Sequence, residues 1–133
     1  MNRVTAAGRK LRILIVDDDD RLRRWLRAQL EAKRFWVHEE SQGDEALETF
    51  LRKGPWDFVL SDLYFFRGER IRNGLELARA IAAACPKQRM AIHTSERCFE
   101  APGPVLHKPY PVGALLKLLR NSVMPFKVDR YPR

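Results

Sequence analysis

The sequence predicts an α/β fold in which a parallel β-sheet is covered by helices on both faces. Short apolar runs alternate along the chain with segments of helical periodicity, and the connections between them are short. The first apolar run is continuous, as expected of a strand that is buried on both faces. Strands that alternate with helices are joined by right-handed crossovers, and these place the strands side by side and parallel.

The first half of the chain contains three strands and two helices. In order, we expect a strand over 11–16 (LRILIV), a helix over 20–33, a strand over 35–40 (FWVHEE), a helix over 43–54 and a strand over 57–62 (DFVLSD). The first helix places Leu22, Trp25, Leu26 and Leu30 on one apolar stripe, which predicts that this stripe faces the core. The second helix opens with acidic residues and ends at Gly54 and Pro55, in agreement with helix-end preferences.

The second half continues the alternation but contains a break. We expect a helix over 75–85 (LELARAIAAAC), a strand over 89–95 (RMAIHTS), a strand over 105–108 (VLHK) and a helix over 111–123. Between the last two strands, Pro102, Gly103 and Pro104 leave room for at most about two helical turns. The helix that should connect these strands is therefore predicted to be short or absent.

Length and composition indicate one domain. The 133 residues divide into a flexible tail over 1–10, a domain over 11–123 and a second tail over 124–133, and we expect no output domain to follow. The apolar runs are too short to cross a bilayer, so no membrane contact is expected. Two cysteines give no disulfide framework, which favours the cytoplasm.

The net charge of +8 raises the possibility of an acidic partner such as nucleic acid. The basic residues are dispersed, however, and lack the interleaved aromatic residues of a base-stacking surface. Direct nucleic-acid binding is therefore the weaker alternative.

Polar residues follow the predicted strands at their carboxyl ends. Asp17 and Asp18 end the first strand, Asp62 the third, Thr94 the fourth and Lys108 the fifth. Because the carboxyl ends of parallel strands share one edge of the sheet, these side chains should converge there. Three carboxylates, a hydroxyl and an amine suit a hard divalent cation such as Mg²⁺ together with a phosphoryl group.

The order of these residues resembles the receiver domain of two-component response regulators. The resemblance covers residues 11–123 and is carried by the stretches ILIVDDD, DFVLSDL, NGLEL, AIHTS and HKP. It implies a flavodoxin-like (βα)5 doubly wound sheet with strand order 2-1-3-4-5, atypical here in its short or absent fourth helix. It also implies a signalling phosphoacceptor that assists its own phosphotransfer and dephosphorylation without being an enzyme in the usual sense.

The resemblance implies a role for each residue at the strand ends. Asp62 is the phosphoacceptor, and it holds Mg²⁺ together with Asp18, with Asp17 through water and with the backbone carbonyl of Tyr64. Lys108 pairs with the phosphoryl oxygens, and Thr94 moves its hydroxyl toward them and couples the chemistry to a change of shape.

The implied partners are a sensor histidine kinase or a histidine phosphotransfer protein, and an unknown downstream protein. The residues expected to contact them are Arg21 and Arg24 of the first helix and Arg67 and Arg70 of the long loop LYFFRGERIRNG. That loop is longer than usual in the family and lacks its proline. Val105 stands where the family often has an aromatic residue, so the usual relay through that strand is not expected.

Simpler roles compete with these assignments. Asp19 or Asp20 can cap the first helix, Thr94 can be a capping hydroxyl, and His93 can pack or hydrogen-bond within the sheet. The whole chain can also be a receiver-like module that binds a protein or nucleic acid through its basic surface without phosphorylation.

Overall fold

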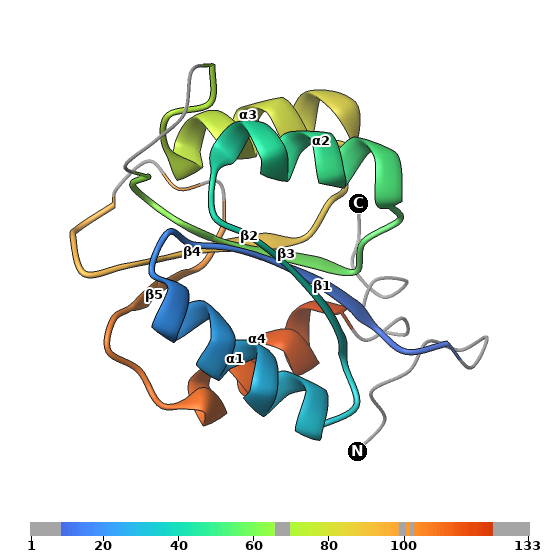
Figure 1. Cartoon of the computed structure of the whole chain (residues 1–133), viewed down its shortest axis with the longest axis vertical. Coiled ribbons are helices and arrows are strands. Elements are labelled where there is room, and N and C mark those ends of the chain that lie inside the picture. Colours follow the sequence, from blue (N-terminus) through green and yellow to red (C-terminus); the bar gives the residue numbers. More distant parts are fainter. Residues whose placement is uncertain (1–8, 66–69, 99–100, 102, 124–133) are drawn as a thin grey trace.

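The computed structural model describes residues 9–65, 70–98, 101 and 103–123 of the chain. The strands are β1 (Arg12–Val16), β2 (Trp36–Glu40), β3 (Phe58–Asp62), β4 (Met90–Thr94) and β5 (Val105–His107). The helices are α1 (Asp20–Ala32), α2 (Gly43–Lys53), α3 (Gly74–Ala84) and α4 (Val112–Val123). Helices α2 and α3 cover one face of the sheet, and α1 and α4 cover the other (Figure 1).

The sheet has the predicted topology. Its five strands are parallel in the order β2-β1-β3-β4-β5, which confirms the flavodoxin-like fold. In the part of the chain that the structure describes, no helix lies between β4 and β5, as the proline-rich segment predicts. None of the described helices is long and apolar enough to cross a bilayer.

Strand β1 lies between β2 and β3 in the interior of the sheet and is buried on both faces. Ile13 and Ile15 belong to the cluster beneath α1 and α4, whereas Leu14 and Val16 belong to the cluster beneath α2 and α3. This division explains why the strand is apolar at consecutive positions. Phe50 of α2 is buried in the second cluster.

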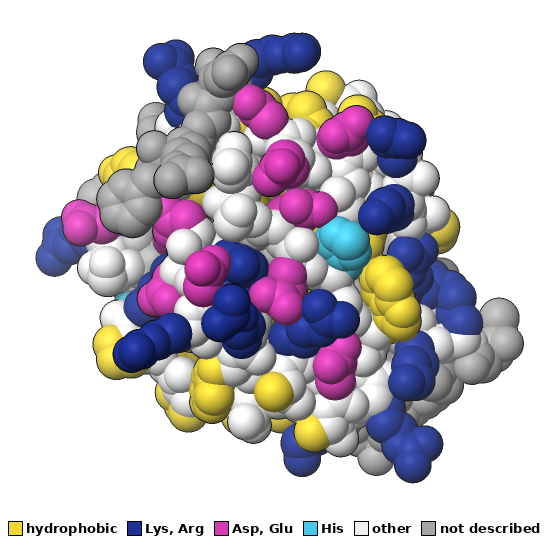
Figure 2. Space-filling view, viewed as in Figure 1, with side chains coloured by type: hydrophobic (Ala, Val, Ile, Leu, Met, Phe, Trp, Pro, Cys, Tyr) yellow, Lys and Arg dark blue, Asp and Glu magenta, His cyan; other side chains and the backbone are white. Residues whose placement is uncertain are grey.

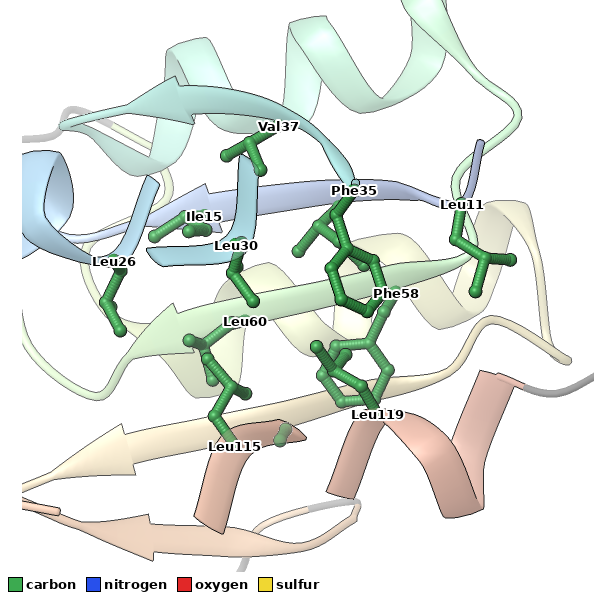
Figure 3. Close-up of a cluster of buried hydrophobic side chains, with 12 residues drawn as sticks. Leu11, Ile15, Leu26, Leu30, Phe35, Val37, Phe58, Leu60, Leu115 and Leu119 are labelled. Atoms are coloured by element: carbon green, nitrogen blue, oxygen red, sulfur yellow. The ribbon is translucent and has the colours of Figure 1, made fainter. Parts of the chain in front are cut away.

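The first cluster joins the sheet to α1 and α4 (Figure 3). Leu26 and Leu30 of α1 are fully buried there, four residues apart on one line of the helix. The prediction that Trp25 shares this core is wrong, because its side chain is 42% exposed. Trp25 lies on α1 at the side of the apolar stripe formed by Leu26 and Leu30, so its ring faces solvent instead of the sheet.

The amino-terminal edge of the sheet is held by charged and aromatic contacts. The Arg12 guanidinium carbon lies 4.5 Å from the ring centre of Trp36 and 4.6 Å from that of Trp56. Asp57 accepts a hydrogen bond from the Arg12 backbone N–H at 2.7 Å and forms an ion pair with Arg9 at 2.9 Å. Arg9, assigned to the tail by the sequence, is therefore tied to the domain. Trp36 and Trp56 therefore lie at the amino-terminal edge of the sheet, opposite to the carboxyl ends of the strands.

Gly74 allows α3 to begin directly against the end of β3. Its backbone N–H donates a hydrogen bond to the Leu63 carbonyl at 2.7 Å. A Cβ atom at this position would overlap the carbonyl oxygen of Asp62. Only glycine permits this close approach, which fixes the backbone that carries Asp62.

We predict that Gly74→Ala destabilises the protein by about 1–3 kcal/mol, because the added methyl group must displace the Asp62 backbone. Gly113→Ala is the matched control. No atom lies within 4 Å of a Cβ at Gly113 of α4, so this change should stabilise the helix by about 0.5–1 kcal/mol. Urea unfolding of both variants checks the prediction, and equal stability of Gly74→Ala and the wild type would contradict it.

Candidate functional site

Three carboxylates meet at the carboxyl ends of neighbouring strands. β1 pairs directly with β3, and this pairing brings Asp17 and Asp18 next to Asp62. One carboxylate oxygen from each of the three residues lies within 4.8 Å of the other two. Asp17 is fully buried, and the Asp62 side chain is 15% exposed. The structure thus confirms the predicted convergence.

The Lys108 ammonium group lies between two of these carboxylates. Its Nζ is 2.8 Å from Asp17 Oδ2 and 3.2 Å from Asp62 Oδ1. The Lys108 backbone N–H donates to the Thr94 carbonyl at 2.9 Å, which continues the β4–β5 pairing and fixes the position of the side chain. Lys108 therefore balances part of the negative charge of the pocket.

Asp17 is held by several partners besides Lys108. Its Oδ1 accepts the backbone N–H of Asp19 at 2.8 Å, and its carbonyl oxygen accepts a hydrogen bond from the Arg23 guanidinium at 2.6 Å. Asp19 in turn caps α1, because its carboxylate accepts the N–H groups of Arg21 and Leu22. The capping role is thus correct for Asp19.

Burial and charge shift the pKa values of the pocket in opposite directions. Burial raises the pKa of Asp62, and repulsion from Asp17 raises it further, against the attraction of Lys108. For Asp17 burial also acts to raise the pKa, but His93, Lys108 and the Asp19 N–H outweigh it and lower the pKa. Burial acts to lower the pKa of Lys108, whereas the two carboxylates raise it.

The residues present fit a hard divalent cation. The donors are carboxylate oxygens, which Mg²⁺ prefers, and they are close enough to share one ion. The raised pKa of Asp62 shows that its negative charge is poorly compensated by the protein alone. A bound cation would supply that compensation. Tyr64, the further predicted ligand, has an exposed side chain and pairs through its backbone with Asn73, and its carbonyl role stays a prediction.

His93 lies against the pocket and Tyr110 lies behind His93, and the sequence did not reveal either placement. His93 of β4 is fully buried and paired in register with Asp62. Its Nε2 lies 2.8 Å from Asp17 Oδ2, and its Nδ1 lies 2.6 Å from the hydroxyl oxygen of Tyr110. A histidine in an apolar strand usually packs within the sheet, so only the strand order reveals this contact with the pocket.

Thr94 ends β4 beside the pocket and is 2% exposed. Its hydroxyl oxygen accepts the Glu96 N–H at 3.0 Å, which is the local capping role that the sequence left open. The switching role of Thr94 stays a prediction.

The arginines predicted to contact partners differ in their surroundings. Arg21 and Arg24 of α1 are exposed, as a contact role requires. Arg70 is also exposed, and its backbone N–H donates to the carboxylate of Asp44 at the start of α2. Arg67 lies outside the described residues. All four contact roles stay predictions.

Other arginines of α1 are engaged by acidic side chains. Arg23 and Arg27 both form ion pairs with Glu39 of β2, at 2.9 and 3.1 Å. On the face shown in Figure 2, acidic side chains lie among the basic ones. The positive charge of this face is therefore partly neutralised, which does not favour a nucleic-acid surface.

Comparison with known proteins places this geometry in context. No family model matches the chain. The transcriptional regulatory protein SrrA of Staphylococcus aureus is 58% identical over 51 residues, which are 38% of this chain. The chain thus spans only 21% of the length of that curated relative.

Solved structures of response-regulator receiver domains superpose on most of the chain. A receiver domain protein from Methanospirillum hungatei has 21% identity and a TM-score of 0.76, with 85% of this chain and 93% of that chain covered. The chain has the receiver-domain fold. The response regulator TrrA of Thermotoga maritima, solved with Mg²⁺ and BeF, has 24% identity and a TM-score of 0.74, with 84% of this chain and 97% of that chain covered. Within the described residues, this receiver fold lacks the helix between β4 and β5.

We predict that Asp62→Asn stabilises the ion-free protein by about 1 kcal/mol, because it removes a carboxylate whose charge is disfavoured there. With a raised pKa, the penalty is complete above the folded-state pKa of Asp62 and vanishes as the pH falls below the unfolded value. The advantage should therefore disappear in acid.

Millimolar Mg²⁺ should reverse the order of stability, since the wild type binds the ion more tightly than Asp62→Asn. Thermal unfolding of both proteins with Mg²⁺ or with a chelator measures the change. An Asp62→Asn variant that is less stable than the wild type in chelator would contradict the charge-crowding explanation.

Proposed function

We propose that the protein is a phosphoacceptor of two-component signalling, which receives a phosphoryl group on Asp62 from a histidine kinase or a histidine phosphotransfer protein. The observation that supports this most strongly is the meeting of three carboxylates with Lys108 at the carboxyl edge of a receiver fold. The match to part of SrrA and the likeness to TrrA agree with the proposal.

Asp62 is oriented for nucleophilic attack. Its Oδ1 accepts the Leu63 N–H at 2.9 Å and lies 3.2 Å from Lys108 Nζ, so this oxygen is engaged by donors of the protein itself. Oδ2 is then the nucleophile: it bonds to phosphorus as the bond from phosphorus to the donor's histidine nitrogen breaks, and the electron pair returns to that nitrogen. The product is an aspartyl phosphate.

The neighbouring residues supply charge and position. Asp18 and Asp62, and Asp17 through water, would hold Mg²⁺, which would supply positive charge to the carboxylates and the phosphoryl oxygens. Lys108 turns from Asp62 to the new phosphoryl oxygens, to which its ammonium group donates. Thr94 reaches toward the same oxygens and links phosphorylation to the shape of β4.

The partners follow from this role. Exposed Arg21 and Arg24 of α1 contact the phosphate donor in this proposal, as does exposed Arg70, and Arg67, which lies outside the described residues, is expected to do the same. Phosphorylation then changes the binding of a downstream protein in the cytoplasm. Return of the phosphoryl group to water, assisted by the same site, resets the protein.

We expect one phosphate per molecule when the purified protein is incubated with Mg²⁺ and acetyl phosphate, and none in Asp62→Asn. Asp20→Asn is the matched control, because Asp20 is an exposed aspartate outside the pocket and should be labelled like the wild type. Intact-protein mass spectrometry measures the added mass. Equal labelling of wild type and Asp62→Asn would remove Asp62 from the role.

The same samples distinguish a module that works without phosphorylation. Such a module would show no heat of Mg²⁺ binding in calorimetry and no phosphate uptake, and any nucleic-acid binding would weaken steeply with salt. Calorimetry measures Mg²⁺ binding directly, whereas two of the three tryptophans, Trp36 and Trp56, lie at the opposite edge of the sheet.

A further inference from the structure

A chain of polar contacts runs from the acidic pocket to the start of α4. It consists of Asp17, which follows β1, His93 of β4, and Tyr110 of the segment before α4. His93 is fully buried, with Nε2 facing Asp17 and Nδ1 facing the Tyr110 hydroxyl. Buried polar side chains are held in place by such contacts because leaving them unpaired is unfavourable.

The charges define the direction of each contact. Nε2 faces a carboxylate at 2.8 Å and must carry a proton, because a lone pair there would be repelled. The Nε2–H of His93 does not point at Asp17 Oδ2 well enough for a hydrogen bond, so the contact between these two atoms is mainly electrostatic. In the neutral ring that carries its proton on Nε2, Nδ1 accepts the O–H of Tyr110 at 2.6 Å. Burial and the two aspartates raise the pKa of Tyr110, which keeps its hydroxyl protonated and able to donate.

Asp17 Oδ2 is shared between two partners. Lys108 Nζ and His93 Nε2 each lie 2.8 Å from this oxygen. When Lys108 turns toward a phosphoryl group on Asp62, His93 becomes the principal partner of Asp17 Oδ2 among the described residues. The His93 ring connects Asp17 on one side with Tyr110 on the other, through Nε2 and Nδ1.

Tyr110 connects this response to the first cluster and to α4. It packs against that cluster and stands two residues before Val112, where α4 begins. The position in β5 where receiver domains often place an aromatic residue is Val105 here, and the described residues form no helix between β4 and β5. The contact between His93 and Tyr110 provides a different connection from the pocket to the surface.

We propose that His93 is a positioning residue that holds the Asp17 carboxylate, and that Tyr110 transmits the movement of His93 to the start of α4. This inference rests on the proposed phosphoacceptor function. The chain Lys108, Asp17, His93 and Tyr110 thus links phosphorylation at the sheet edge to the face formed by α4.

The test uses the full chain with Mg²⁺ and beryllofluoride, a phosphoryl mimic. In the wild type, backbone amide NMR signals at Val112 and Gly113 should shift when beryllofluoride is added to the Mg²⁺-loaded protein. Tyr110→Phe keeps the ring and removes the hydroxyl, so binding should remain within about twofold while the α4 shifts fall below half. A purely packing role for Tyr110 would leave these shifts unchanged.

Variants of His93 test the contact between His93 and Asp17. His93→Leu should weaken Mg²⁺ and beryllofluoride binding by roughly 5- to 10-fold, because it removes the electrostatic contact that holds the Asp17 carboxylate. His93→Gln, which restores an N–H donor toward Asp17, should recover most of that loss without restoring the α4 shifts.

The outcomes separate this inference from the proposed function. A wild type that binds no beryllofluoride with Mg²⁺ overturns both. Binding in the wild type combined with unchanged α4 shifts in Tyr110→Phe overturns the connection alone, and wild-type affinity in His93→Leu overturns the positioning role. Circular dichroism and melting temperature confirm that each variant is folded.

Discussion

The crowding of negative charge at the carboxyl edge of the sheet is the constraint on which the rest of the structure depends. Two unit charges about 4 Å apart repel by roughly 4 kcal/mol at an effective dielectric of 20. The pairing of β1 with β3 forces Asp17, Asp18 and Asp62 into this situation. The protein offsets it with Lys108, and the remaining imbalance defines a site for a cation.

The surrounding fold holds this unfavourable arrangement in place. Apolar residues bury β1 on both faces, so the strand cannot withdraw its terminal aspartates from the edge. Gly74 brings α3 against the carbonyl of Asp62, and Arg23 binds the carbonyl of Asp17 while pairing with Glu39 of β2. Stability generated in the core therefore maintains a strained distribution of charge at the edge, as is common at functional sites.

Much of the fold was predictable because polar residues end apolar strands in a regular order. The meeting of Asp17, Asp62 and Lys108 follows from parallel topology alone. The roles of His93 and Tyr110 did not follow, because the contact of His93 with Asp17 reaches across β3 and depends on the register that pairs His93 with Asp62. Trp25 was misplaced because spacing defines an apolar stripe but not which of its edges meets the sheet.

The most direct test of the shared cation site is paramagnetic NMR with Mn²⁺ in place of Mg²⁺. Substoichiometric Mn²⁺ should broaden the amide signals of the residues that follow the strands, above all Asp18, Leu63 and Lys108, because broadening falls steeply with distance from the ion. The indole N–H signals of Trp36 and Trp56 at the opposite edge should stay sharp. Broadening of the indole signals without broadening at the strand ends would contradict the account.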